Sequence, residues 1–383
     1  MTRLVIFFLL AVPISAYAQA KDAAGAAAIA HHSAKVLFEK GDLEGAVPFY
    51  RRAIELDPQR LSAHLELGVA LFQLGDADGA LAAFRTVLRL DPKHALAHSY
   101  LGNVLYSRRD VEGAVRSYRR AIELDPALAQ SHSDLGAILY GLGDVEGAIA
   151  ACSRAVELER DHVQALYNLG LAFKKKGDSE QAAQSLRRAI QADSTYVPAR
   201  YSLALLLYER GYAAEAIAQY RQIISLDPKH SRAYNNIGHI LYSRGDVIGA
   251  MALLQRALEL NPDYAQAHFN LGLAFKKQGR IDEAVQAFGA ALRLRPGHVR
   301  AYNHLGAALH ARGDRVAAVQ VYQQAIRLKP DFAGPRFGLA TILQEQGNEA
   351  AAIQQYRAII DIGNDEHLQR MAQQILRAMG EKP

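Results

Sequence analysis

Histidines are the residues through which this 383-residue chain could most readily do chemistry, because it contains 14 of them. His64, His98, His132 and His268 recur at multiples of 34 residues, which suggests a shared zinc site as a hypothesis. Zinc needs every ligand atom within about 2 Å, whereas neighbouring packed helices lie about 10 Å apart. If each interval is one packed unit, these histidines cannot share an ion, and His94 lies in a turn between units. We therefore interpret them as packing residues, and the sequence predicts no metal site.

Two other features resemble reactive groups but lack the surroundings that such groups need. The segment Gly141–Gly147 has the glycine pattern of a phosphate-binding loop, yet no predicted strand precedes it and it falls on a turn between helices. Cys152 is the single cysteine, which excludes an internal disulfide and any cysteine-based zinc site. It occupies the place that Tyr118 and Tyr220 have in other intervals, so a buried packing role is favoured over that of a nucleophile. The sequence predicts no catalytic residue and no cofactor, and thus no enzyme.

The charge balance argues against nucleic acid as a partner. There are 44 lysines and arginines against 39 aspartates and glutamates, which gives a net charge of +5 and a pI of about 9.1. This is a small surplus rather than a basic stripe. Hydrophobic residues make up 50% of the chain, so it has enough of them to form a packed core.

The N-terminal segment differs from the rest of the chain. A positive charge at Arg3 is followed by the apolar run Leu4–Val12 and by Ala16-Tyr17-Ala18. Residues 1–18 therefore have the pattern of a secretory signal peptide cleaved after Ala18. A membrane-spanning helix is less favoured, because the apolar run is shorter than the roughly 20 residues that such a helix needs. We expect a periplasmic or secreted protein with no stable membrane span after processing. Retention of the segment as an anchor is the alternative.

From Ala27 to Glu366 the chain divides into ten blocks of 34 residues without an insertion. Position 20 of the block is alanine in all ten, position 8 is glycine in seven, and position 15 is glycine in every block but the third, which has Arg109. Residues 19–26 form a lead-in, and 367–383 a capping helix and tail. The predicted blocks are 27–60, 61–94, 95–128, 129–162, 163–196, 197–230, 231–264, 265–298, 299–332 and 333–366.

Each block reads as two helices. Apolar residues at positions 3, 4, 7, 8, 10 and 11 indicate one amphipathic helix, and a second follows with an apolar face through positions 20, 24 and 27. Small residues at positions 8 and 20 allow the two to approach closely. The Asp-Pro pair at positions 31 and 32, as in Asp57-Pro58, should end the second helix. We expect the aspartate to cap the next helix and the proline to lie in its first turn.

These columns resemble tetratricopeptide repeats, and ten in-register copies make the resemblance specific over nearly all of the mature chain. The resemblance implies an all-α fold. Antiparallel helix pairs would stack as a right-handed superhelical solenoid of ten 34-residue helix-turn-helix repeats, closed by a C-terminal capping helix. It also implies a concave groove that binds a partner, and no chemistry.

The other positions of the first helix, 2, 5, 6, 9, 12 and 13, form the arc that this family places on its concave wall. Asparagine recurs at position 6 and could bond an extended peptide backbone. The partial column is similar to the ladder of the nucleocytoplasmic sugar transferase that modifies serine and threonine, although Ser202 and His304 interrupt it. The clamp of chaperone-binding relatives is disfavoured, because no lysine stands at position 5. The predicted groove residues are Tyr106, Tyr140, Asn168, Lys174, Lys175, Tyr201, Tyr208, Asn235, Asn236, Tyr242, Asn270, Lys276 and Lys277.

Two nearly identical phrases place lysines where most blocks have an aromatic residue at position 12. YNLGLAFKKKGD at 167–178 and FNLGLAFKKQGR at 269–280 lie 102 residues apart, which indicates that a three-block unit was duplicated. We predict that the two lysine pairs bracket one acidic, extended ligand of about nine residues at ~3.3 Å each. The alternative is that the lysines only keep the solenoid soluble.

The leading functional hypothesis is a non-catalytic protein–protein interaction scaffold of the bacterial cell envelope. It would bind an extended, acidic segment of another protein in its groove. The alternative is a periplasmic module of anionic polysaccharide export or of peptidoglycan-enzyme assembly, in which the aromatic residues stack on sugars.

Overall fold

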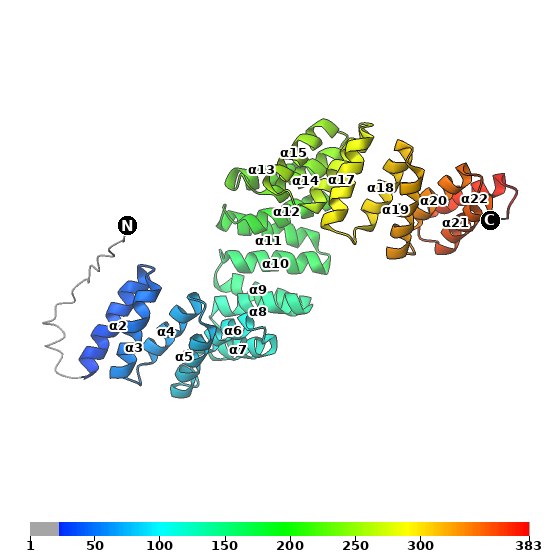
Figure 1. Ribbon diagram of the computed structural model, residues 1–383. Helices are drawn as coiled ribbons and strands as arrows, with labels where there is room; N and C mark the ends of the chain where they lie inside the picture. Colours follow the sequence, from blue (N-terminus) through cyan, green and yellow to red (C-terminus); the bar gives the residue numbers. More distant parts are fainter. Residues whose placement is uncertain (1–22, 383) are drawn as a thin grey trace, which may run out of the picture. The chain divides into compact units, whose positions relative to one another are not determined.

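The computed structural model describes residues 23–382, and every regular element within that range is an α-helix. There are 21 described helices, α2 to α22, and within each unit helices that follow one another in the chain pack together, as α8 does with α9 and α16 with α17 (Figure 1). The predicted all-α repeat fold is therefore confirmed. The predicted signal segment, residues 1–18, lies outside the described residues. None of the helices in residues 23–382 is both long and apolar enough to cross a membrane.

The chain divides into two compact units, one ending at Ala199 and the other beginning at Arg200. In the first unit each block holds a pair of helices joined by a turn of two or three residues. Its helices are α2 (Ala23–Glu39), α3 (Leu43–Leu56), α4 (Leu61–Gln73), α5 (Ala77–Leu90), α6 (Ala95–Ser107), α7 (Val111–Leu124), α8 (Ala129–Leu142), α9 (Val145–Leu158), α10 (Val163–Lys176) and α11 (Ser179–Ala192).

The second unit repeats this arrangement and ends with an unpaired helix. The last helix, α22, buries Ala372 and Leu376 in a core cluster with Tyr356 of α21 and Ala340 of α20. The helices are α12 (Val197–Glu209), which begins before the boundary, α13 (Ala213–Leu226), α14 (Ser231–Ser243), α15 (Val247–Leu260), α16 (Ala265–Lys277), α17 (Ile281–Leu294), α18 (Val299–Arg312), α19 (Arg315–Leu328), α20 (Ala333–Glu345), α21 (Glu349–Ile362) and α22 (Glu366–Ala378).

The turn inside a block needs one residue in the left-handed region. Gly143 takes it at φ 89°, a conformation that glycine adopts without steric cost. In the third block Arg109 takes the same conformation at φ 65°. The aspartate that follows caps the second helix: the carboxylate of Asp144 accepts a hydrogen bond from the amide of Gly147 at 2.9 Å. The Gly-Asp pair therefore ends one helix and starts the next.

The expectation for the Asp-Pro pair is confirmed for the end of the second helix and wrong for the start of the next. Asp57 is the C-cap of α3, but the N-cap of α4 is Arg60. The Asp57 carboxylate instead accepts a hydrogen bond from the amide of Gln59 at 3.3 Å, which closes a turn. Pro58 lies within that turn, between the end of α3 and the start of α4.

The small residue at position 8 lies against the side chain at position 24 of the same block. A Cβ atom added to Gly68 would lie 2.6 Å from Cε1 of Phe84, and one added to Gly136 would lie 2.3 Å from Sγ of Cys152. Such distances are far below van der Waals contact, so the close approach predicted from these glycines is confirmed. Cys152 is fully buried, as predicted, and burial raises the pKa of its thiol to about 12.

The periodic histidines stabilise the turns between blocks. The histidines at position 4 are His64, His98, His132 and His268. In each, Nε2 lies within 3.1 Å of the carbonyl oxygen of the proline six residues earlier. The histidine is the donor, because a carbonyl oxygen can only accept. Four other histidines, at position 34 of every second block, cap the first helix of the block that follows. In each, Nδ1 accepts a hydrogen bond from the backbone amide three residues later; these residues are His94, His162, His230 and His298. Within the described range, no group of three His, Cys, Asp or Glu residues could hold a metal ion.

Candidate functional site

In each unit, side chains 35 residues apart join the first helices of successive blocks. Position 12 of one block meets position 13 of the next. The Nζ of Lys175 lies 5.0 Å from the ring centroid of Tyr140 and donates to the Tyr140 carbonyl at 3.3 Å. The Nζ of Lys277 lies 5.2 Å from the ring centroid of Tyr242. The same tyrosine–lysine pair therefore forms once in each unit.

These pairs hold a positive charge at the surface. Lys175 and Lys277 are exposed, and their tyrosines are half-buried. An exposed cation–π contact contributes only about 0.5–1 kcal/mol, so each ammonium is biased toward one position and remains accessible. The neighbouring lysines, Lys174 and Lys276, are half-buried, and burial lowers the pKa of Lys276. The two lysines of each predicted pair therefore have different surroundings.

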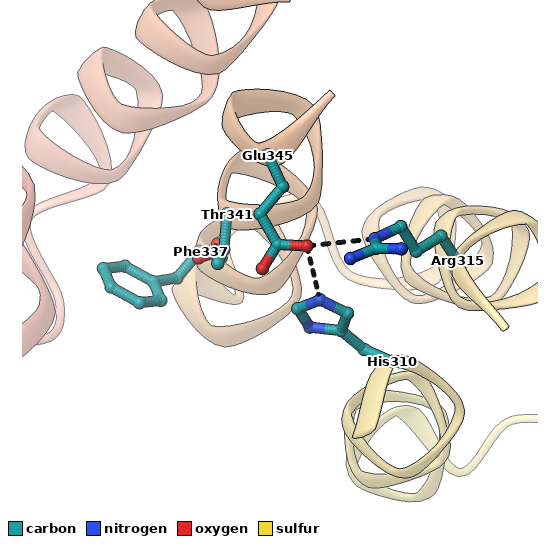
Figure 2. A network of polar contacts seen from close by, with 5 residues as sticks. All are labelled: His310, Arg315, Phe337, Thr341 and Glu345. Atoms are coloured by element: carbon teal, nitrogen blue, oxygen red, sulfur yellow. Dashed lines mark hydrogen bonds and ion pairs between the residues drawn. The ribbon is translucent and has the colours of Figure 1, made fainter. Parts of the chain in front are cut away.

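Other side chains at positions 12 and 13 follow the same pairing. The hydroxyl of Tyr208 donates to Ser243 at 3.4 Å. His310 lies 3.0 Å from a carboxylate oxygen of Glu345, which also accepts from Arg315 at 3.1 Å (Figure 2). The hydrogen bonds from His310 and then from Arg315 hold the pKa of the Glu345 carboxyl below its ordinary value. Tyr106 also stands at position 12, but position 13 of the next block is Gly141, which has no side chain to cover the ring. Tyr106 is accordingly 53% exposed.

A second set of contacts joins position 5 of one block to position 6 of the next. In the second unit the Nδ2 of Asn236 donates to the hydroxyls of Tyr201 at 3.0 Å and Tyr220 at 2.9 Å. Asn235 donates to Asn236 at 3.1 Å, and Asn270 donates to the Oδ1 of Asn235 at 2.9 Å. The network therefore runs without interruption across three blocks.

This network corrects one expectation. Positions 5 and 6 were expected to lie open on the arc, but Asn235 is 2% exposed, Asn270 is 4% exposed and Asn168 is 7% exposed. Neighbouring first helices pack against each other along these positions, so the amides bond one another instead of facing solvent. Of the predicted asparagines, Asn236 alone is only half-buried, and its amide is already shared with two tyrosines.

The equivalent contact in the first unit is incomplete. Ser133 and Asn168 stand at positions 5 and 6 of successive blocks, the places of Asn235 and Asn270 in the second unit. Both Oγ of Ser133 and Nδ2 of Asn168 are buried without a hydrogen-bond partner. Oδ1 of Asn168 does accept from Gln164 at 3.1 Å. The shorter serine side chain explains why the bond between the two blocks is missing here.

The sequence analysis missed a cluster around Phe269 in the second unit. The rings of His298 and His304 lie 4.7 and 5.6 Å from the Phe269 ring, and Arg300 lies over it at 6.0 Å. Burial, followed by the charges of Lys276 and Arg300, lowers the pKa of His304 to about 4. The only signal in the sequence was that His304 interrupts the asparagine column.

Comparison with protein families places this chain among repeat proteins. A model described as the C-terminal domain of cilia and flagella-associated protein 70 matches residues 11–231, more than half of the chain. Tetratricopeptide repeat models match residues 238–279, 269–333 and 309–375. The chain therefore belongs to the tetratricopeptide repeat family. It is an interaction scaffold that binds other proteins. Its fold is one that is typically non-catalytic.

A solved structure agrees with this fold. No curated protein matches the chain. The Cut9–Hcn1 hetero-tetramer of APC/C is 15% identical with a TM-score of 0.53, over 92% of this chain and 76% of that one. YrrB, described as a TPR protein with an unusual peptide-binding site, is 24% identical with a TM-score of 0.44, over 49% and 97%. MamA is 28% identical with a TM-score of 0.39, over 42% and 95%.

Proposed function

We propose that this protein is an exported scaffold of the bacterial cell envelope that binds extended, acidic segments of other proteins along its first helices. The observation that supports this most is the recurrence of the tyrosine–lysine pair. Tyr140–Lys175 and Tyr242–Lys277 have the same spacing of 35 residues and nearly the same distance, 5.0 and 5.2 Å. An ammonium held over a ring can bond a carboxylate, while the ring edge contacts the apolar part of the ligand.

The pairs also reduce the entropic cost of binding. A free lysine loses rotamer freedom when it binds a ligand, at about 0.5–1.5 kcal/mol for each immobilised side chain. Lys175 has part of that freedom restricted already by the Tyr140 ring and carbonyl. Because screening at physiological salt acts over about 8 Å, a carboxylate must come close to benefit. The site therefore selects for acidic residues in direct contact.

Photocrosslinking in cells tests the binding surface. A photoreactive residue would replace Tyr140 or Tyr242, and a control would replace Ile248, which is 75% exposed on α15. We expect crosslinks from the two tyrosine positions to acidic segments, with few from the control. Lys175→Glu and Lys277→Glu should reduce the crosslinks in their own units, whereas Lys229→Glu, an exposed lysine in a turn between blocks, should not.

The outcomes separate the candidates. Crosslinked segments without acidic residues, or yields unchanged by both charge reversals, would contradict the proposal. Binding of a purified anionic glycan that depends on the same lysines would favour the polysaccharide alternative.

Export is tested separately by the intact mass of the natively expressed protein. A chain beginning at Gln19 in the periplasmic fraction is expected. A full-length product in the cytoplasm would contradict this part of the proposal.

A further inference from the structure

Phe269 is the centre of a cluster of cationic and ionisable groups on the first helices of the second unit. His298, His304 and Arg300 all lie within 6.0 Å of its ring centroid. Lys276 follows Phe269 by seven residues on α16, which places it on the same face of that helix. Three positive or ionisable side chains thus surround one buried ring, and the charge of Lys276 acts on one of them, His304.

Within residues 23–382, no ion pair joins Lys276, Arg300 or His304 to an acidic side chain. The charged and titratable groups that act on His304 are Lys276 from α16, and Arg300 and His298 from α18 and its N-cap. From helix α17, the Phe288 ring lies 5.7 Å from the ring of His304.

The positive potential extends to α14. Arg300 also lowers the pKa of His239 on that helix, after the larger effect of burial. In an empty site these groups repel one another, and His304 stays neutral at pH 7, since its pKa is held at about 4. A bound anion would remove that repulsion.

We propose that Lys276, Arg300 and His304 form an anion-binding subsite that seats one carboxylate of the acidic segment and takes up a proton when it is occupied. This rests on the proposed function, because it assigns the position of one acidic side chain of that ligand. The Arg300 guanidinium offers a planar pair of donors and Lys276 a point charge. His304 gains a proton from solvent on a ring nitrogen and becomes a third charged donor.

Proton uptake makes binding depend on pH. An anion in contact raises the pKa of His304 toward its ordinary value of about 6.5. Between the pKa of the free site and that of the occupied site, the bound state holds more protons, so affinity rises as pH falls. With an occupied pKa of about 6.5, binding should be about tenfold tighter at pH 5.5 than at pH 7.5.

The first experiment uses sulfate as the probe, because its charge is constant across this pH range. In the full chain with isotope-labelled histidine, the His304 resonance is followed by NMR from pH 3.5 to 8, in sulfate and in chloride of equal ionic strength. We expect the His304 titration to move up by at least one pH unit in sulfate. Lys276→Gln and Arg300→Gln should each reduce the shift, and an unmoved titration in wild type would overturn the proposal.

The second experiment uses a nine-residue, glutamate-rich peptide and calorimetry in two buffers that differ in ionisation enthalpy. Wild type should take up close to one proton per peptide at pH 5.5 and bind about tenfold tighter than at pH 7.5. His304→Asn, which places the amide of Asn270 at the same block position, should abolish the proton uptake and make the affinity independent of pH between 5.5 and 7.5.

These two experiments separate the subsite from the proposed function. If the peptide does not bind wild type at either pH, the proposed function fails, and the sulfate titration still decides the subsite. If the peptide binds and Lys277→Glu weakens it, but His304→Asn keeps the full pH dependence, the subsite is wrong and the proposed function stands.

Discussion

Replacing Asn235 with alanine removes the centre of the amide network in the second unit. Its side chain donates to Asn236 at 3.1 Å and to Tyr264 at 3.4 Å, and it accepts from Asn270 at 2.9 Å. Asn235 and Asn270 are 2% and 4% exposed, so water cannot easily replace the lost partner. The Asn270 amide would be left buried with a donor that has nothing to bond.

The expected loss follows from these contacts. Two good hydrogen bonds contribute about 1 kcal/mol each, and a buried donor left without a partner costs a further 1–3 kcal/mol or so. The sum is about 3–5 kcal/mol, and its lower end corresponds to a change of about 100-fold in an opening equilibrium. Cooperativity within the network would act in the same direction.

Native-state hydrogen exchange is the appropriate assay, since a repeat array need not unfold in a single step. Backbone amides of α14 and α16 should exchange about 100-fold faster in Asn235→Ala. The control is Asn303→Ala, at position 5 of the ninth block. Among the described residues, the Asn303 side chain makes no hydrogen bond. Both variants gain the same helix propensity, so the difference between them isolates the network. Equal effects in the two variants would refute the reasoning.

Three further predictions concern individual positions. Arg109→Gly should stabilise α6 and α7 by roughly 0.5–1 kcal/mol, because Arg109 holds φ 65°, a left-handed conformation that costs arginine more than glycine. Gly75→Arg, at φ 86°, should lower the stability of the protein by a comparable amount, and denaturant titrations measure both changes. Cys152 should resist a maleimide at pH 7.4 until denaturant is added, and rapid labelling of the native protein would contradict its burial. The folded state lowers the pKa of His304 to about 4, so it binds fewer protons than the unfolded chain. Stability of the second unit should therefore decline by up to about 3 kcal/mol as pH falls from about 6.5 to 4, and His304→Asn should flatten that slope.

The fold could be predicted because its determinants repeat. One alanine or glycine column means little, but ten copies of the same spacing leave a single packing arrangement. The contact of Gly68 with Phe84 and that of Gly136 with Cys152 are the same contact with different side chains. The Asp57-Pro58 turn was misassigned because spacing alone does not tell how many residues separate a helix end from the next cap.

The candidate site was only partly predictable, because its contacts cross between blocks. Periodicity within one helix separates a core face from an outer arc, and it assigned Asn235 and Asn270 to the arc. Their burial depends on the neighbouring first helix, at a separation of 35 residues that no pattern within a block reveals. The Phe269 cluster is harder still to predict, since it combines side chains from more than one block.

The contacts between blocks also bear on the duplicated lysine phrases. If the lysines served only solubility, nothing would require a tyrosine 35 residues before the lysine at position 13 of each phrase. Tyr140 precedes Lys175 and Tyr242 precedes Lys277 at that separation, and both ammonium groups lie over the rings. The duplication predicted from the sequence would therefore have copied an interacting pair that spans two blocks. A pair worth about 0.5–1 kcal/mol contributes little to the stability of the array. We therefore propose that its main effect is to hold a positive charge where an acidic ligand can reach it.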